Sequence, residues 1–179
     1  NMQYSIFQQL MSIPPNGSEP EPDAATCDYT DPQTIECELE EGLTFSNGNE
    51  LTSSDVLFSF KRNIEIADPN GSSVLLGSIA NGDAEAPSLA DGAIETPDDT
   101  TVIFNLNAPD TTFLKVLTTA TTSIVDEDTF PADELQDDTA VIGSGPYTLS
   151  QYRPKQLTVL EANENYTGTK APASKTIYI

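Results

Sequence analysis

The chain has 179 residues, of which 37% are hydrophobic, 29 are Asp or Glu and 7 are Lys or Arg, so its formal net charge is −22, and it contains no histidine. A surface this acidic repels phosphate backbones and anionic lipids, which argues against nucleic-acid and membrane-surface binding. The absence of histidine removes the commonest general base and the commonest metal ligand. No apolar run reaches the roughly 18 residues of a membrane span, and no signal peptide is recognisable, so any leader is expected outside this chain.

The N-terminal region divides into two parts. Residues 1–12 are expected to be helical, because Ile6, Phe7 and Leu10 recur at helical spacing. Residues 13–23 are rich in proline, glycine and acids, a composition that predicts a loop.

The two cysteines, Cys27 and Cys37, lie on two predicted strands at residues 24–29 and 34–40. A turn at residues 30–33 would place them opposite one another in an antiparallel ladder. Cysteines opposed in this way can form a disulfide, which would indicate an oxidising compartment. The alternative is a pair of half-buried free thiols, and the matching register of the two strands favours the disulfide.

A helix is predicted to begin after Thr52, a good N-cap whose partner Asp55, three residues on, completes a box-like pair. The other predicted elements are short helices at residues 73–79 and 110–118, an acidic loop at 126–139, and strands at 102–106, 147–152, 156–162 and 176–179. Strands and short helices without regular β–α–β alternation indicate an α+β fold.

Two segments suggest chemistry without completing a motif. The sequence around Ser144 resembles a hydrolase nucleophile turn, but that motif requires glycine two residues on each side of the serine, and position 142 is isoleucine. The oxygen-rich stretch at residues 81–85 alternates like a calcium loop, but Ala86 and Gly92 occupy positions that require Gly and Glu. We therefore expect a soluble, exported domain with no catalytic residue, no metal and no cofactor.

Three segments carry a resemblance to known proteins. Residues 39–62 hold a strand, a Phe-Ser-Asn-Gly turn and the Thr52 helix with its Asp-Val and Phe-Ser pairs. Residues 94–106 hold Ile-Glu-Thr-Pro-Asp-Asp and a strand, followed by Pro109 and Phe113. Residues 143–149 begin Gly-Ser-Gly-Pro-Tyr. In this order and at these separations, the segments resemble the family 5 extracellular solute-binding proteins, which include oligopeptide-, dipeptide- and nickel-binding receptors.

The resemblance implies a receptor of two lobes that closes on a solute and passes it to an ABC importer without chemistry on the ligand. Residues 1–179 would then cover part of the first lobe of a periplasmic-binding-protein type II-like receptor. Residues 24–142 would form its small extra domain, with residues 1–23 and 143–179 leading to and from the main sheet. The implied partners are a peptide or peptide-like solute and ABC permease subunits. The implied protein is a monomer, extracellular or periplasmic, and anchored as a lipoprotein in its full-length form.

The same resemblance suggests ligand contacts. The stretch after the Thr52 helix approaches the cleft in such receptors, so Leu75 and Leu76 are candidates, with Ser144 and Tyr147 as further candidates. The alternative is that both leucines are core residues, which is the commoner role of such side chains. The alternative functions are a secreted cell-wall-associated adhesion domain and a hydrolase fragment, and the missing histidine and catalytic motif count against the hydrolase.

Overall fold

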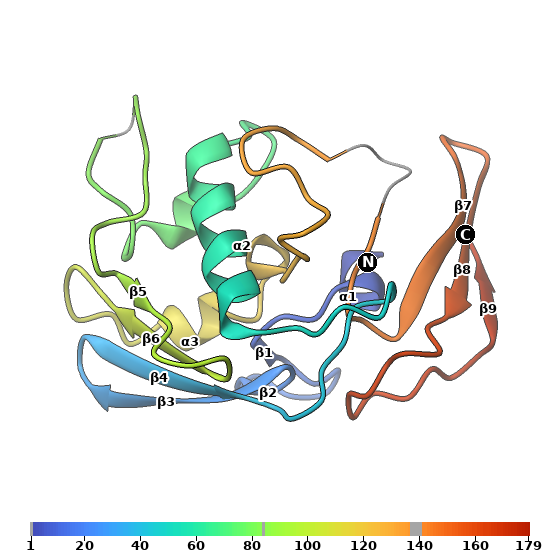
Figure 1. The fold of residues 1–179 in the computed structure, drawn as a ribbon, viewed down its shortest axis with the longest axis horizontal. Helices are drawn as coiled ribbons and strands as arrows, with labels where there is room; N and C mark the ends of the chain where they lie inside the picture. Colours follow the sequence, from blue (N-terminus) through green and yellow to red (C-terminus); the bar gives the residue numbers. More distant parts are fainter. Residues whose placement is uncertain (1, 84, 137–140) are drawn as a thin grey trace.

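The computed structural model describes residues 2–83, 85–136 and 141–179. These residues form a two-stranded ribbon, a four-stranded sheet and a three-stranded sheet, joined by short helices and long loops (Figure 1). The elements in chain order are α1 (Gln3–Ile6), β1 (Met11–Ser12), β2 (Glu21–Pro22), β3 (Ala25–Asp31), β4 (Thr34–Leu39), α2 (Ser53–Ile66), the 3₁₀ helix η1 (Ser73–Leu76), β5 (Ile94–Glu95), β6 (Thr101–Asn105), α3 (Phe113–Val116), the 3₁₀ helix η2 (Ala120–Thr122), β7 (Tyr147–Arg153), β8 (Leu157–Ala162) and β9 (Thr176–Tyr178). None of the helices in these three ranges combines the length and hydropathy needed to cross a bilayer.

The four-stranded sheet supports the main core. Its strands follow the order β3, β4, β6, β5, each antiparallel to its neighbour, and alternate side chains point to a buried face. α2 packs over the sheet (Figure 1), and its Phe60 ring centroid lies 5.2 Å from that of Phe104 on β6. Phe113 of α3 extends this aromatic group, 5.5 Å from Phe104. The antiparallel sheets with separate helices confirm the predicted α+β class, and the predicted strands match β3, β4, β6 and β7 to β9 to within two residues.

α2 begins where the sequence predicts. Oδ2 of Asp55 accepts hydrogen bonds from the backbone N–H of Thr52 at 2.9 Å and from its hydroxyl at 3.2 Å, within a capping box. This box satisfies N–H groups that have no partner inside the helix. The helix ends at Ile66, and the C-cap residue Ala67 has a φ of 47°, in the left-handed region.

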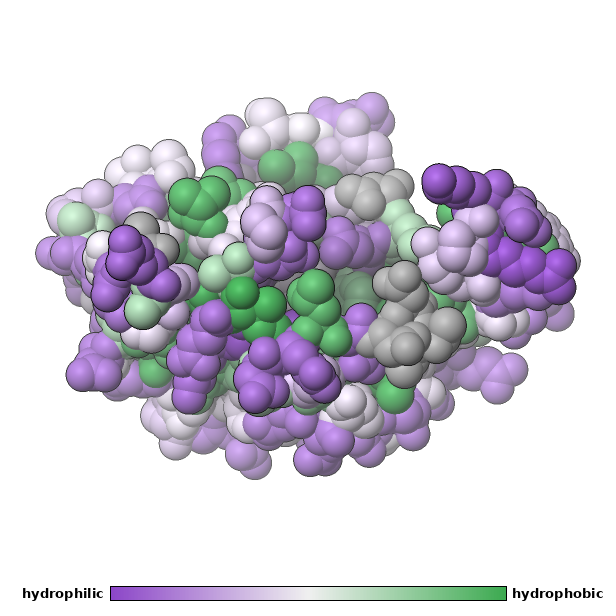
Figure 2. All heavy atoms as spheres, turned by 90° about the horizontal axis from the view of Figure 1, so that it is seen from above, coloured by the Kyte–Doolittle hydropathy of each residue, from purple (hydrophilic) through white to green (hydrophobic). Residues whose placement is uncertain are grey.

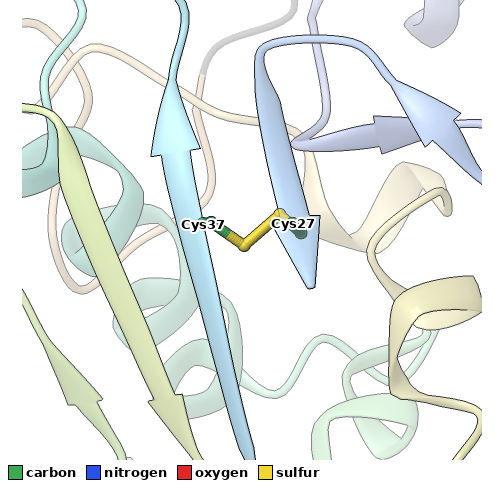
Figure 3. Close-up of a disulfide and its surroundings, with 2 residues drawn as sticks. All are labelled: Cys27 and Cys37. Carbon is green, nitrogen blue, oxygen red and sulfur yellow. A yellow bond between two sulfur atoms is a disulfide. The ribbon is translucent and has the colours of Figure 1, made fainter. Parts of the chain in front are cut away.

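The cysteine pair closes a disulfide between β3 and β4 (Figure 3). Cys27 and Cys37 are direct partners in the antiparallel register of the two strands. Both side chains are buried in the main core, as the alternation with exposed glutamates on β4 predicts. The predicted disulfide is confirmed, and the alternative of two free thiols is not observed.

The predicted N-terminal helix at residues 1–12 is mostly wrong. Only α1 is helical, and Phe7 already has extended dihedral angles of −114° and 144°. The backbone carbonyls beyond it bind distant segments: that of Gln8 accepts from the N–H of Ile124 at 3.0 Å, and that of Leu10 accepts from the N–H of Ala25 at 3.1 Å. A helix that continued to Ser12 would need the Gln8 carbonyl for the N–H of Ser12, whereas the residue four positions after Leu10 is Pro14, which has no N–H to donate. The tertiary contact of Gln8 therefore prevails over the local hydrophobic spacing.

The three-stranded sheet has a small core of its own. Ile6, Tyr147 and Leu160 form a hydrophobic cluster between α1 and the antiparallel sheet β7–β8–β9. The loop that precedes β9 returns to the first half of the chain. There Thr44 donates from its hydroxyl to the backbone oxygen of Asn165 at 2.8 Å, and the Asn165 amide donates to the backbone oxygen of Ser46 at 3.0 Å.

Candidate functional site

A groove of about 350 Å³, here called the α2–η2 groove, lies on one face of the molecule. The C-terminal half of α2 and the turn after it form one wall, and η2 with residues 130–135 forms the other. Figure 2 looks onto the molecule from above and shows hydrophobic residues gathered near the middle of this view, among hydrophilic loops. The residues that line the groove include apolar ones, such as Phe130 and Leu135, and polar ones, such as Arg62 and Asn63.

Arg62 brings a positive charge to the α2–η2 groove. Its Nε donates to the carbonyl of Pro131 at 2.5 Å, and its Nη2 donates to the carbonyl of Glu134 at 2.6 Å. The guanidinium carbon lies 5.7 Å from the ring centroid of Phe130, within cation–π range. Partial burial lowers the pKa of Arg62 from its ordinary value, yet an arginine side chain stays protonated in proteins. The groove thus holds a fixed cation in a chain with few cations.

Asn63 and Ser59 add neutral polar groups from the same helix. The Asn63 amide donates to the backbone oxygen of Thr121 and, at 3.1 Å, to its hydroxyl. Ser59 receives a hydrogen bond at 2.9 Å from the backbone N–H of Val125. These bonds hold the two walls of the groove together, so the groove is preorganised by α2 rather than by a free loop.

The rim of the groove leads directly to the predicted ligand-binding stretch. The turn at residues 68–72 lines the groove, and η1 follows at once. η1 is shorter than the helix predicted at residues 73–79. Its three neighbouring apolar side chains differ in exposure: Val74 is 85% exposed, Leu75 is 43% exposed and Leu76 is fully buried. Leu76 belongs to the main core. For this leucine the structure agrees with the alternative that it is a core residue. Val74, which the sequence did not single out, offers the larger apolar surface.

A second hollow of about 300 Å³ adjoins the groove. It is lined by Met2, Gln3, Phe7 and Phe130 together with residues of β7. Gln3, Phe7 and Phe130 also line the α2–η2 groove. The rings of Phe7 and Phe130 meet edge to face, 6.3 Å between centroids. A ligand lying in the groove could therefore extend over these two rings toward β7.

The candidates Ser144 and Tyr147 lie in a different setting. Ser144 is 1% exposed, and its hydroxyl has no hydrogen-bond partner among the described residues. The Tyr147 hydroxyl accepts from the backbone N–H of Ser174 at 3.1 Å. Tyr147 packs in the small cluster beside the three-stranded sheet, whereas Leu76 packs in the main core. Leu76 and Tyr147 thus belong to separate hydrophobic clusters. A ligand role for any of the four candidates stays a prediction.

The glycines around Ser144 are required by close packing. Gly145 donates its N–H to the carbonyl of Ile6 at 2.8 Å, and a Cβ built on Gly145 would lie 2.6 Å from the Ile6 carbonyl carbon. A Cβ on Gly143 would lie 2.1 Å from the Ile6 oxygen. Gly143 and Gly145 do not have the positive φ that occurs at Gly42 and Gly48, so the lack of space, and not the backbone conformation, requires glycine here.

Comparison with known proteins identifies a family over most of the chain. The sequence model of the bacterial extracellular solute-binding proteins, family 5 Middle, matches residues 19–179. The chain is 30% identical over 137 residues to the probable D,D-dipeptide-binding periplasmic protein DdpA of Escherichia coli (strain K12), and this match covers 74% of the chain and 24% of DdpA.

Solved structures show the same fold. Listeria monocytogenes OppA bound to peptide superposes with a TM-score of 0.85 at 19% identity, covering 99% of this chain and 36% of that one. The clavulanic acid biosynthesis oligopeptide binding protein 2 superposes with a TM-score of 0.79 at 24% identity, covering 99% of this chain and 35% of that one. The chain thus spans about a third of the length of these structures.

Proposed function

Because this chain belongs to the bacterial extracellular solute-binding proteins of family 5, we propose that the protein binds peptides or related small solutes outside the membrane and delivers them to an ABC importer. The observation that carries the proposal is the family match over residues 19–179. The proteins that resemble this chain bind a dipeptide or oligopeptides according to their names, which favours a peptide as the solute. We propose that the protein performs no chemistry on that solute.

The two hydrophobic clusters support a division of the chain. The main cluster draws almost entirely on residues between Leu10 and Ile124, and the smaller one on Ile6 and strands β7 and β8. We propose that residues 24–142 form the small extra domain of the first lobe. Residues 1–23 and 143–179 would connect that domain to the main sheet of the lobe.

Within this chain, we propose that the ligand lies along the α2–η2 groove and over the exposed apolar surface of η1. Val74 and Leu75 provide that surface, and the turn at residues 68–72 joins it to the groove. Burial of apolar ligand surface supplies most of the affinity in such sites, while a few fixed polar groups orient the ligand. Arg62 and Asn63 are such polar groups here.

The test is the substitution Leu75→Asp in the longest natural form of the protein. Leu75 is partly exposed, so a charge there should leave the fold intact while it repels an apolar ligand side chain. We expect peptide affinity, measured by calorimetric titration with a peptide mixture, to fall at least about tenfold, the equivalent of about 1.4 kcal/mol. Tyr178→Asp is the matched control, since Tyr178 is an exposed apolar residue on β9. Equal peptide affinity in the two variants would rule out η1 as a contact.

The remaining assignments concern the whole protein. We propose ABC permease subunits as the partners, a monomeric state, and attachment to the outer face of the cell membrane as a lipoprotein. The disulfide between Cys27 and Cys37 is consistent with a location outside the cytoplasm. Because the chain spans only part of its relatives' length, we expect it to bind peptide more weakly on its own than within the longer receptor, which encloses more of the ligand surface.

A further inference from the structure

The sequence contains three tripeptides of the form Asn-x-Ser/Thr, the acceptor signal for N-linked glycans, and they begin at Asn16, Asn70 and Asn165. The glycan is attached to the side-chain nitrogen of the asparagine, and the hydroxyl two residues later is part of the signal. Both groups must be exposed and free of other hydrogen bonds for the signal to be used on the folded protein. The three tripeptides differ in this respect.

The tripeptide at Asn165 is held by the first half of the chain. The Asn165 Nδ2 donates to the backbone oxygen of Ser46 at 3.0 Å, and the Thr167 hydroxyl donates to the backbone oxygen of Gly42 at 3.0 Å. A modifying enzyme would have to break both hydrogen bonds before it reached the nitrogen, and neither is replaced by another bond within the protein. Asn165 is therefore closed to modification in the folded state.

The tripeptide at Asn70 is exposed, but its asparagine is engaged. Oδ1 of Asp68 accepts from the backbone N–H of Asn70 at 2.9 Å and from its side-chain nitrogen at 3.3 Å. Asn70 and the two residues after it also line the α2–η2 groove. A glycan at this position would cover the groove in which we propose that the solute lies.

The tripeptide at Asn16 is open. Asn16, Gly17 and Ser18 are all exposed, and within the described ranges the side chains of Asn16 and Ser18 make no hydrogen bond. The N–H of Gly17 donates to the carbonyl of Pro14 at 2.9 Å, so the backbone forms a tight turn with Asn16 at its third position. Pro14 and Pro15 restrict φ in this turn. An ordered backbone therefore presents the Asn16 amide to solvent, with no hydrogen bond to break first.

The turn at Asn16 lies away from the proposed solute site. It belongs to the connection between β1 and β2, and Asn16 lines neither the α2–η2 groove nor the hollow beside it. In Figure 1 the ribbon β1–β2 is in the lower part of the molecule, whereas the C-terminal half of α2, one wall of the groove, is in the upper part. A glycan on Asn16 would thus extend into solvent and leave the groove open.

We propose that Asn16 is an N-glycosylation site and receives an oligosaccharide from a lipid-linked sugar phosphate donor. The Asn16 Nδ2 forms a bond to the anomeric carbon of the first sugar, and the bond between that carbon and the phosphate oxygen breaks. The lipid phosphate leaves with the electron pair, and the proton lost by Nδ2 passes to the solvent. The proposal rests on the extracellular location proposed above and does not depend on which solute the protein binds.

The test is peptide mapping by tandem mass spectrometry of the protein purified from the cells in which it occurs naturally. We expect the peptide that contains Asn16 to carry a sugar mass on the asparagine, and the peptide that contains Asn165 to be unmodified. Ser18→Ala, which keeps the asparagine and removes the hydroxyl of the signal, should abolish the modification of Asn16. Ser72→Ala, the matched change in the signal at Asn70, should leave it in place.

Several results would overturn the proposal. Unmodified Asn16 in protein recovered outside the cytoplasm is one, and equal modification of Asn165 is another, since exposure in the folded protein would then not select the site. Asn16→Gln should lose the glycan and keep the peptide affinity of the unaltered protein, so that failure of the glycan site is distinguishable from failure of the peptide site. Unmodified protein recovered only from the cytoplasm would overturn the proposed location together with this site.

Discussion

The carboxylate of Asp55 accepts a hydrogen bond of 3.0 Å from the backbone N–H of Glu127, which lies 72 positions later in the chain. Asp55 caps the first turn of α2 with its other oxygen. One side chain therefore fixes both the start of the helix and the segment that leads to residues 130–135 of the α2–η2 groove. The geometry of that groove depends on this carboxylate.

Substitution Asp55→Ala should destabilise the protein by about 1–2 kcal/mol, because it removes the cap and leaves the Glu127 N–H without its acceptor. Urea unfolding followed by circular dichroism measures the change. Glu65→Ala, at an exposed position on the same helix, is the control and should lie within about 0.5 kcal/mol of the unaltered protein. A loss of stability no greater than that of the control would show that the long-range bond contributes little.

Acid titration should reveal the role of Asp98. Its carboxylate accepts from the N–H groups of Thr100 at 3.0 Å and Thr101 at 2.8 Å, and these bonds lower its pKa from the ordinary value. An acid whose pKa is lower in the folded state stabilises the fold above its unfolded pKa of about 3.9, and that stability is lost as the pH falls through the folded pKa. The stability difference between the protein and Asp98→Asn should therefore shrink below about pH 4.

Urea unfolding at a series of pH values provides this test. The contribution of Asp55 to stability should change with pH in the direction opposite to that of Asp98, because burial raises the pKa of the Asp55 carboxyl in the folded protein. Its ionised form therefore opposes folding at higher pH, and that penalty disappears on acidification. A stability difference for Asp98→Asn that stays constant from pH 6 to pH 3 would contradict the proposed role of the Asp98 carboxylate.

Reduction of the disulfide should lower the free energy of unfolding by about 2–3 kcal/mol, as expected for a loop of this size. Cys27 and Cys37 are separated by 10 positions and are already paired in register, so the sheet should persist after reduction. Intact mass before and after reduction and alkylation shows whether the bond is present. Labelling of two thiols without reductant would refute it.

Substitution Gly145→Ala should destabilise the protein by about 1–3 kcal/mol, the usual range for overpacking. The new methyl group would meet the backbone of Ile6, which cannot yield as a flexible side chain could. Gly82→Ala is the matched control, since a Cβ at Gly82 would have no heavy atom within 4 Å. Thermal unfolding of the two variants gives the comparison, and equal midpoints would show that α1 shifts without cost.

Local sequence signals predicted the elements whose contacts are near in the chain. The alternation around Cys37 fixed the register of β4 against β3, because the side-chain period of a strand decides which residues face the core. The pair Thr52 and Asp55 likewise predicted the start of α2, since a capping box is complete within four residues.

The sequence could not predict features that need distant partners. The spacing of Ile6, Phe7 and Leu10 suits a helix, but the carbonyl of Gln8 is used by the N–H of Ile124, so the helix stops early. The α2–η2 groove was missed for the same reason. Arg62 reads as an ordinary helix residue until the fold brings Pro131 and Phe130 to it.

The hydrogen bonds of Asn165 to residues 44 and 46 determine the order in which the molecule can be assembled during synthesis. All residues of the four-stranded sheet and of α2 have been synthesised once the ribosome has passed Asn105. The turn around Ser46 must then wait, with its acceptor and donor groups solvated, until about 60 further residues have emerged, a delay of roughly 3–12 s at 5–20 residues per second. Nascent chains arrested between these points should already resist proteolysis in the sheet and remain cleavable near Ser46.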